Sequence, residues 1–134
     1  MSDMEITFPG GKKVNALWHG FEIKTDQPVD SGGDGTAPAP FDLFLASLGT
    51  CAGIFAVGFL QGRGLSTEGF KINLDFDWDQ DAHLIKKVGM RITLPKDFPE
   101  QYRAALIRSV ELCTVKRHIA NPPEFEIAVQ GGAK

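Results

Sequence analysis

The chain has 134 residues, of which 43% are hydrophobic and 23% charged, the proportions of a globular protein of one domain, residues 1–134. Its 14 basic and 17 acidic residues give a formal net charge of −3, and no basic cluster is dense enough to indicate nucleic-acid binding. The first ten residues are polar and acidic, unlike a secretory signal. We therefore expect a cytoplasmic protein without a permanent structural disulfide.

The N-terminal part predicts three short strands joined by tight glycine-containing turns. The predicted strands are Met4–Phe8, Val14–Trp18 and Phe21–Thr25. Residues 28–40 are rich in glycine and proline, which predicts an irregular loop. Its Ser31–Gly35 run matches no dinucleotide or P-loop pattern, and Asp34 would repel a phosphate, so no phosphate site is assigned.

A long apolar helix is predicted from Pro40 to about Gly62, with Asp42 in its first turn, where an acidic residue is favoured. The stretch Leu43–Leu60 has 18 residues without a charge, which raises the question of a membrane span. Small and hydroxyl residues interrupt it and no basic cluster orients it, so we expect no membrane insertion. Such a helix must be buried on all sides, and we expect a second subunit to cover it, with Gly49–Gly53 as a small-residue patch for close approach.

Two segments after the helix alternate apolar and polar residues, which predicts half-buried strands. They are Phe70–Trp78 and Val88–Leu94, and the polar loop between them predicts an antiparallel hairpin. Pro99 starts a second helix, whose predicted buried stripe is Tyr102, Leu106, Val110 and Cys113.

The alternating residues Phe125, Ile127 and Val129 predict a last strand. The resulting order, three strands, a helix, two strands, a helix and a strand, is typical of an α+β fold. We expect largely antiparallel sheets packed on two main helices.

Cys51 and Cys113 are the candidate functional residues, Cys51 in the middle of the first predicted helix and Cys113 late in the second. Their spacing excludes a Cys-x-x-Cys motif, and His19, His83 and His118 are too scattered to complete a metal site. Two packed helices could bring the thiols within disulfide reach. Spacing alone leaves open whether they are a redox pair or inert buried side chains. A redox pair needs a lowered thiol pKa at the attacking sulfur.

The run SGGDGTAPAPFDLFLASLGTC, Ser31–Cys51, resembles the OsmC/organic hydroperoxide resistance family. The Gly-Gly loop, the proline, the acidic residue, the small-residue helix and the cysteine occur in the family's order. Glu111–Val115 is similar to the family's second cysteine segment, and a turn and a final strand are expected after it. The resemblance spans nearly the whole chain.

This resemblance implies an intertwined homodimer with its long helices buried between sheets. It also implies an enzyme, a thiol-dependent peroxidase acting on organic hydroperoxides without a cofactor. By this resemblance Cys51 is the peroxidatic nucleophile and Cys113 the resolving thiol, and a dithiol reductant restores both.

The chain departs from the family at the charged groups beside the peroxidatic cysteine. Where hydroperoxide resistance members have Gly-Gly-Arg, this chain has Gly10-Gly11-Lys12, and Phe41 stands where they have a glutamate. Lys12 and Asp42 are therefore the candidates for the charged roles, and the alternative for Asp42 is a plain acidic residue of the first helical turn. A lysine supplies the charge but not the planar fork of an arginine.

Two other functions stay open on the residues alone. One is a non-enzymatic dimer that binds an apolar small molecule, and the other is a structural dimer with inert thiols. The residues predicted to contact a substrate or ligand are aromatic: Phe41, Phe44, Phe55 and Tyr102.

Overall fold

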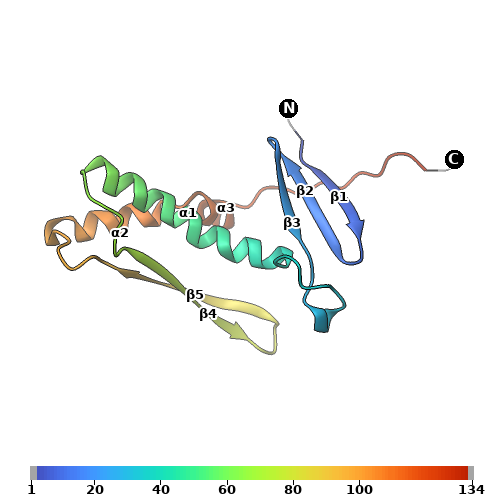
Figure 1. The fold of residues 1–134 in the computed structure, drawn as a ribbon, viewed down its shortest axis with the longest axis horizontal. Helices are drawn as coiled ribbons and strands as arrows, with labels where there is room; N and C mark the ends of the chain where they lie inside the picture. Colours follow the sequence, from blue (N-terminus) through green and yellow to red (C-terminus); the bar gives the residue numbers. More distant parts are fainter. Residues whose placement is uncertain (1–2, 133–134) are drawn as a thin grey trace. The chain divides into compact units, whose positions relative to one another are not determined.

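The computed structural model describes residues 3–132, so the two residues at each end of the predicted 1–134 domain lie outside the described residues. The fold is α+β, as predicted, with two small antiparallel sheets and three α-helices among the described residues (Figure 1). The chain divides into two compact units, one up to Ser47 and one from Leu48 onward.

The first unit contains a three-stranded antiparallel sheet in the order β1-β2-β3. Its strands are β1 (Glu5–Gly10), β2 (Lys13–Trp18) and β3 (Phe21–Thr25). All three were predicted, with β1 ending two residues later than expected. The turn between β2 and β3 places His19 and Gly20 at positive φ, 49° and 80°, which glycine adopts without strain.

The loop after β3 folds around the buried carboxylate of Asp26. This carboxylate accepts hydrogen bonds from the Thr36 hydroxyl at 2.6 Å, the Thr36 N–H at 3.1 Å and the Gln27 N–H at 2.8 Å. The bonds from Thr36 and Gln27 hold the pKa of Asp26 well below its ordinary value. Only glycine fits at Gly33, because a Cβ there would lie 2.1 Å from the Gln27 carbonyl oxygen. The glycine-rich run is thus a scaffold around a carboxylate.

Helix α1 (Pro40–Gly62) has the predicted bounds. Asp42 acts at its start, where its carboxylate accepts the Ala39 N–H at 3.0 Å and so satisfies a backbone donor outside the helical ladder. By length and composition alone α1 is apolar enough to cross a membrane, with a mean hydropathy of 2.1 in its most apolar window. A core helix of a soluble protein passes the same test. Only 28% of that window is buried within one chain.

The second unit packs helices on one face of a β-hairpin (Figure 1). Strands β4 (Lys71–Asp79) and β5 (Leu84–Thr93) pair antiparallel, with Ile72 opposite Ile92 and Leu74 opposite Met90. The inward apolar residues of the hairpin pack against a buried helical cluster: Ala52, Ala56, Phe59, Leu60, Leu106 and Val110. Gly49 permits the close approach of α1 to β4, since a Cβ there would lie 3.1 Å from Leu74.

The predicted second helix is broken, which corrects the sequence-based prediction. A 3-10 turn η2 (Glu100–Tyr102) leads into α2 (Arg103–Glu111), and a separate helix α3 (Thr114–Ala120) follows. The stripe on α2 is buried as expected, at Leu106 and Val110. Cys113, however, has a non-helical backbone, φ −48° and ψ 124°, and is the N-cap residue of α3 instead of continuing α2. The break leaves the first N–H groups of α3 without intrahelical acceptors.

The predicted last strand is also wrong for the single chain. Phe125, Ile127 and Val129 are 88%, 92% and 92% exposed, and no strand is assigned after Ala120 in the part of the chain that the structure describes. A strand forms only where a neighbouring backbone accepts and donates its ladder hydrogen bonds. The segment therefore has the alternating pattern of a strand, but it pairs with no neighbouring strand in the described part of the chain.

Candidate functional site

Cys51 and Cys113, far apart in the sequence, are in contact in the second unit. Cys51 is half-buried on α1, and Cys113 is fully buried at the cap of α3. Both thiols are free. The Cys113 side chain acts on the Cys51 thiol and is one of the groups that lower its pKa. The structure thus brings the two predicted residues together, although Cys113 lies at a helix break and not inside a helix.

Groups at the start of α3 lower the pKa of the Cys51 thiol. The backbone N–H of Val115 makes the largest contribution to this lowering. Burial acts in the opposite direction, because it disfavours the charged thiolate. The Cys113 side chain, and then the backbone N–H and hydroxyl of Thr114, lower this pKa further. The lowered pKa makes Cys51 the candidate nucleophile.

Thr114 and Val115 are site residues that sequence reasoning missed. Their contribution depends on the break between helices α2 and α3 at Cys113, because the first N–H groups of α3 have no acceptor within the helix. Neither glycine nor proline marks this break in the sequence. Only the shared neighbourhood with Cys113 could have drawn attention to them.

Lys12 and Asp42 lie in the first unit, whereas both cysteines lie in the second. Lys12 stands in the turn between β1 and β2, and its Cε atom is 3.7 Å from the position of a Cβ on Gly32. Asp42 makes the helix-start contact with Ala39 described above. Their predicted action on Cys51 stays a prediction.

The four predicted ligand-contacting aromatic residues also fall in both units. Phe41 and Phe44 are stacked with ring centroids 5.6 Å apart, and they are 48% and 42% exposed. In the second unit Phe55 is half-buried on α1. Tyr102 contacts Phe59 edge-to-face at 6.2 Å.

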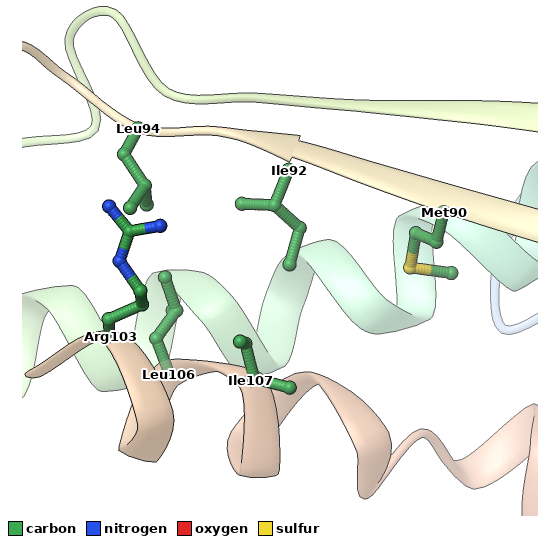
Figure 2. Close-up of a pocket in the computed structure, with 6 residues that line it drawn as sticks. All are labelled: Met90, Ile92, Leu94, Arg103, Leu106 and Ile107. Carbon is green, nitrogen blue, oxygen red and sulfur yellow. The ribbon is translucent and has the colours of Figure 1, made fainter.

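An apolar groove lies between β5 and α2, apart from the predicted aromatic residues (Figure 2). Its volume is about 280 Å³, and its lining residues are Met90, Ile92, Leu94, Arg103, Leu106 and Ile107. Figure 2 shows Arg103 at the Leu94 end of the groove and Met90 at the other end. Arg103 is held by an ion pair with Glu100, with Nε and Oε1 3.1 Å apart. The alternating strand residues were predicted to be buried, but the groove was not predicted.

No group of three or more histidine, cysteine, aspartate or glutamate side chains suited to a metal ion occurs among residues 3–132. The chemistry that the thiol site itself can perform is oxidation and reduction of sulfur. A stabilised thiolate attacks an electrophilic oxygen, and a second thiol in contact can close a disulfide before further oxidation.

Comparison with known proteins gives a family match and a fold match. The family model described as OsmC-like protein matches residues 33–128. No curated protein matches the sequence significantly. Several solved structures share the fold at low sequence identity.

One of these structures is a protein from Psychrobacter arcticus 273-4, provisionally described as osmotic stress induced and part of a detoxification response. It has a TM-score of 0.71 and 24% identity over 87% of each chain. A hypothetical protein from Aquifex aeolicus VF5 has a TM-score of 0.63 and 16% identity, over 91% of this chain and 89% of that one. A third, from Legionella pneumophila, is named an organic hydroperoxide resistance protein OsmC and a predicted redox protein. Its TM-score is 0.55, with 18% identity over 89% of this chain and 90% of that one.

Proposed function

The chain belongs to the OsmC-like protein family, and we propose that it is a thiol enzyme that reduces organic hydroperoxides through Cys51 and Cys113. The observation that supports this proposal is that Cys113 lies beside Cys51, whose pKa is lowered chiefly by the Val115 N–H and further by the Cys113 side chain. The name of the Legionella pneumophila protein of the same fold supports the substrate class.

The proposed reaction follows from the unequal environments of the two thiols. The Cys51 thiolate attacks the outer oxygen of the hydroperoxide, the O–O bond breaks, and the alkoxide leaves and takes up a proton to give the alcohol. Cys51 is now a sulfenic acid. The Cys113 sulfur, already in contact, attacks the Cys51 sulfur, a disulfide forms and water leaves. A dithiol reductant then reduces this disulfide and becomes a disulfide itself.

Thiol counting tests this proposal. The reduced protein is treated with one equivalent of cumene hydroperoxide, and the free thiols are counted in the parent and in Cys51→Ser and Cys113→Ser. The parent should lose both thiols and yield one equivalent of alcohol. Cys113→Ser should hold a sulfenic acid that dimedone labels, and Cys51→Ser should keep its thiol. Unchanged thiols after many equivalents of hydroperoxide would overturn the proposal.

Lys12 and Asp42 complete the proposal as charged groups that assist at the peroxide. Lys12→Ala and Asp42→Asn should each slow thiol loss without changing the number of thiols lost. A rate equal to that of the parent would remove the residue from the proposed site.

A homodimer is the assembly that we propose for this function. Much of the apolar surface of α1 is uncovered in one chain, and Gly53 and Gly58 have no described atom within 4 Å of a Cβ built on them. The exposed segment Phe125–Val129 has the alternation of a strand that lacks a neighbour. A second copy of the chain supplies both an apolar cover for α1 and a partner for this segment. The cytoplasm is the compartment that we propose, because the two thiols are free and the reaction needs them reduced.

The alternative function is binding of an apolar small molecule, and the groove between β5 and α2 favours it. Ile107→Trp would fill this groove without touching either cysteine. The test is the fluorescence of anilinonaphthalene sulfonate, which brightens in apolar sites. Dye binding that is lost in Ile107→Trp but kept in Cys51→Ser supports the alternative, and equal binding in both removes it.

A further inference from the structure

The groove between β5 and α2 is long and apolar on its strand side (Figure 2). Met90 and Ile92 of β5, and Leu94 directly after the strand, alternate along the chain and so face the same side. At about 3.3 Å per residue, this row of side chains is about 13 Å long. All three are half-buried, so part of each side chain remains available to a ligand. The row suits an extended chain better than a compact ring system.

The helix side of the groove supplies its floor and its charge. Leu106 is only 1% exposed, whereas Ile107 is 44% exposed. Arg103 is the first residue of α2, and Figure 2 shows its guanidinium beside Leu94 at one end of the groove. Five of the lining residues are apolar and the sixth is this cation. A molecule with an anion at one end and an alkyl chain behind it complements this arrangement.

Arg103 has donors suited to an anion besides those that meet Glu100. The contact with Glu100 goes through Nε, which lies 3.1 Å from Oε1 and 3.2 Å from Oε2. The terminal nitrogens Nη1 and Nη2 carry the other four N–H groups of the guanidinium, whose planar fork matches the two oxygens of a carboxylate. The side chains of the ion pair are 57% and 79% exposed, so the pair contributes little free energy and does not exclude a second carboxylate.

The size of the groove favours a small molecule over a protein partner. Its volume of about 280 Å³ is near the lower end of the range of small-molecule sites. A stable protein interface takes about 800 Å² from each partner and is depleted of charged residues at its core. Here a charged residue is one of the six that line the groove.

We propose that the groove binds an aliphatic monocarboxylate, with the carboxylate on the Arg103 guanidinium and the alkyl chain along the side chains from Leu94 to Met90. The inference rests on the alternative function proposed for the groove, whose ligand class it names, and it does not depend on the thiol chemistry. Each CH₂ group that leaves water strengthens binding about fourfold, so the chain should matter as well as the charge.

Isothermal titration calorimetry of the full chain with octanoate tests the charge and the chain separately. Octan-1-ol has the same chain without the charge, and hexanoate has the same charge on a shorter chain. Arg103→Met removes the cation and keeps a flexible apolar side chain. Arg108→Met, at an exposed arginine of the same helix that does not line the groove, is the matched control. Ile107→Trp fills the groove.

Octanoate should bind saturably and about tenfold more tightly than hexanoate. Arg103→Met should weaken octanoate binding about fivefold to tenfold and leave octan-1-ol binding unchanged. Arg108→Met should change neither, and Ile107→Trp should abolish both. Circular dichroism checks that each variant is folded. If Arg103→Met is unfolded, Arg103→Gln serves in its place.

A folded parent without saturable octanoate binding would overturn the inference, as would hexanoate that binds as tightly as octanoate. Equal losses of octanoate and octan-1-ol binding in Arg103→Met would also overturn it. If Ile107→Trp changes the association of the protein in sedimentation velocity, the groove belongs to a contact with a second copy and the inference is overturned.

The outcomes separate this inference from both proposed functions. Dye binding that is lost in Ile107→Trp, together with octanoate binding that ignores Arg103, would keep the apolar site and remove the carboxylate from it. Cys51→Ser should bind octanoate as the parent does. Octanoate binding that disappears in Cys51→Ser would overturn the inference, whereas thiols that still react with hydroperoxide would leave the peroxidase proposal intact.

Discussion

The buried Cys113 acts on the half-buried Cys51: its side chain adds to the lowering of the Cys51 pKa that the Val115 N–H chiefly causes, so the two cysteines lie in unequal environments. Cys113 has no exposed surface, whereas Cys51 is reachable. The lowered pKa and the greater exposure of Cys51 both favour the attacking role that we propose for it.

Selective alkylation should reveal this difference. Because the pKa of Cys51 is lowered from 9.0, its thiolate fraction near neutral pH exceeds that of an ordinary thiol. We expect iodoacetamide to modify Cys51 first and Cys113 much more slowly, as mass spectrometry of peptides from partly alkylated protein would show. Unfolding in urea should equalise the two rates. Faster modification of Cys113 in the folded protein would contradict the assignment of roles.

The lowered pKa of Cys51 also links stability to pH. A thiol that ionises more readily in the folded state than in the unfolded state favours folding wherever the folded thiolate is present. This contribution is complete above the ordinary thiol pKa and is lost as the pH falls through the folded-state value. The free energy of unfolding of the parent should therefore rise relative to Cys51→Ser as the pH approaches 9.0, the unperturbed value. Parallel curves of unfolding free energy against pH for the two proteins would contradict this link between Cys51 ionisation and stability.

Ionic strength should have little effect on the alkylation rate of Cys51, because the groups that lower its pKa most are neutral. Raising the salt from about 0.05 M to about 0.5 M shortens the Debye length several-fold and weakens the attraction of any cation to the sulfur. Alkylation by the uncharged reagent iodoacetamide should then change by less than about twofold. A several-fold fall would show that a cation, such as Lys12, stabilises the thiolate.

Asp26→Asn should destabilise the first unit, because an amide cannot accept all the donors that the carboxylate accepts. Three hydrogen bonds from Thr36 and Gln27 converge on the two oxygens of Asp26, and the NH2 group of an amide would face at least one of these donors. We expect the Tm to fall by about 5 °C or more in differential scanning calorimetry. Asp30→Asn, at an exposed aspartate of the same loop, is the control and should change little.

The stability difference between the parent and Asp26→Asn should change with pH in a definite direction. The pKa of Asp26 is depressed in the folded protein, so its contribution is complete above the ordinary aspartate value of 3.8 and is lost only as the pH falls below it. The stability difference between parent and Asp26→Asn should therefore shrink in acid. A difference that grows in acid would contradict the buried carboxylate as its source.

The sequence predicts the long elements well and the helix break poorly. Helix α1 and the β4–β5 hairpin have strong periodicity, and their bounds agree with prediction to within a few residues. No proline or glycine marks the break at Cys113, so the sequence predicts that the buried stripe of the second helix continues past Val110 to Cys113. Pairing of the two cysteines follows from the family resemblance, whereas the effect of Val115 and Thr114 on the Cys51 pKa depends on the fold at the helix break.

The segment Phe125–Val129 failed as a predicted strand for a different reason. Its alternation is real, but strand formation is a property of two backbones and only one was available to it in the described chain. Sequence periodicity identifies the face that is to be buried and not the molecule that buries it. The same holds for the uncovered face of α1.

Ile127→Asp should therefore separate a monomer from a homodimer. Ile127 is 92% exposed in one chain, so the substitution should leave a monomer's stability unchanged. In the proposed homodimer the side chain is buried by the partner, and its removal should weaken association about tenfold to a hundredfold. Glu126→Gln, whose side chain points to the opposite face of the segment by alternation, is the control. Sedimentation velocity over a dilution series should show a dimer in the parent and control, and dissociation of Ile127→Asp at higher concentration. A monomeric parent would remove the homodimer, and a parent and variant that dissociate together would place this segment outside the interface.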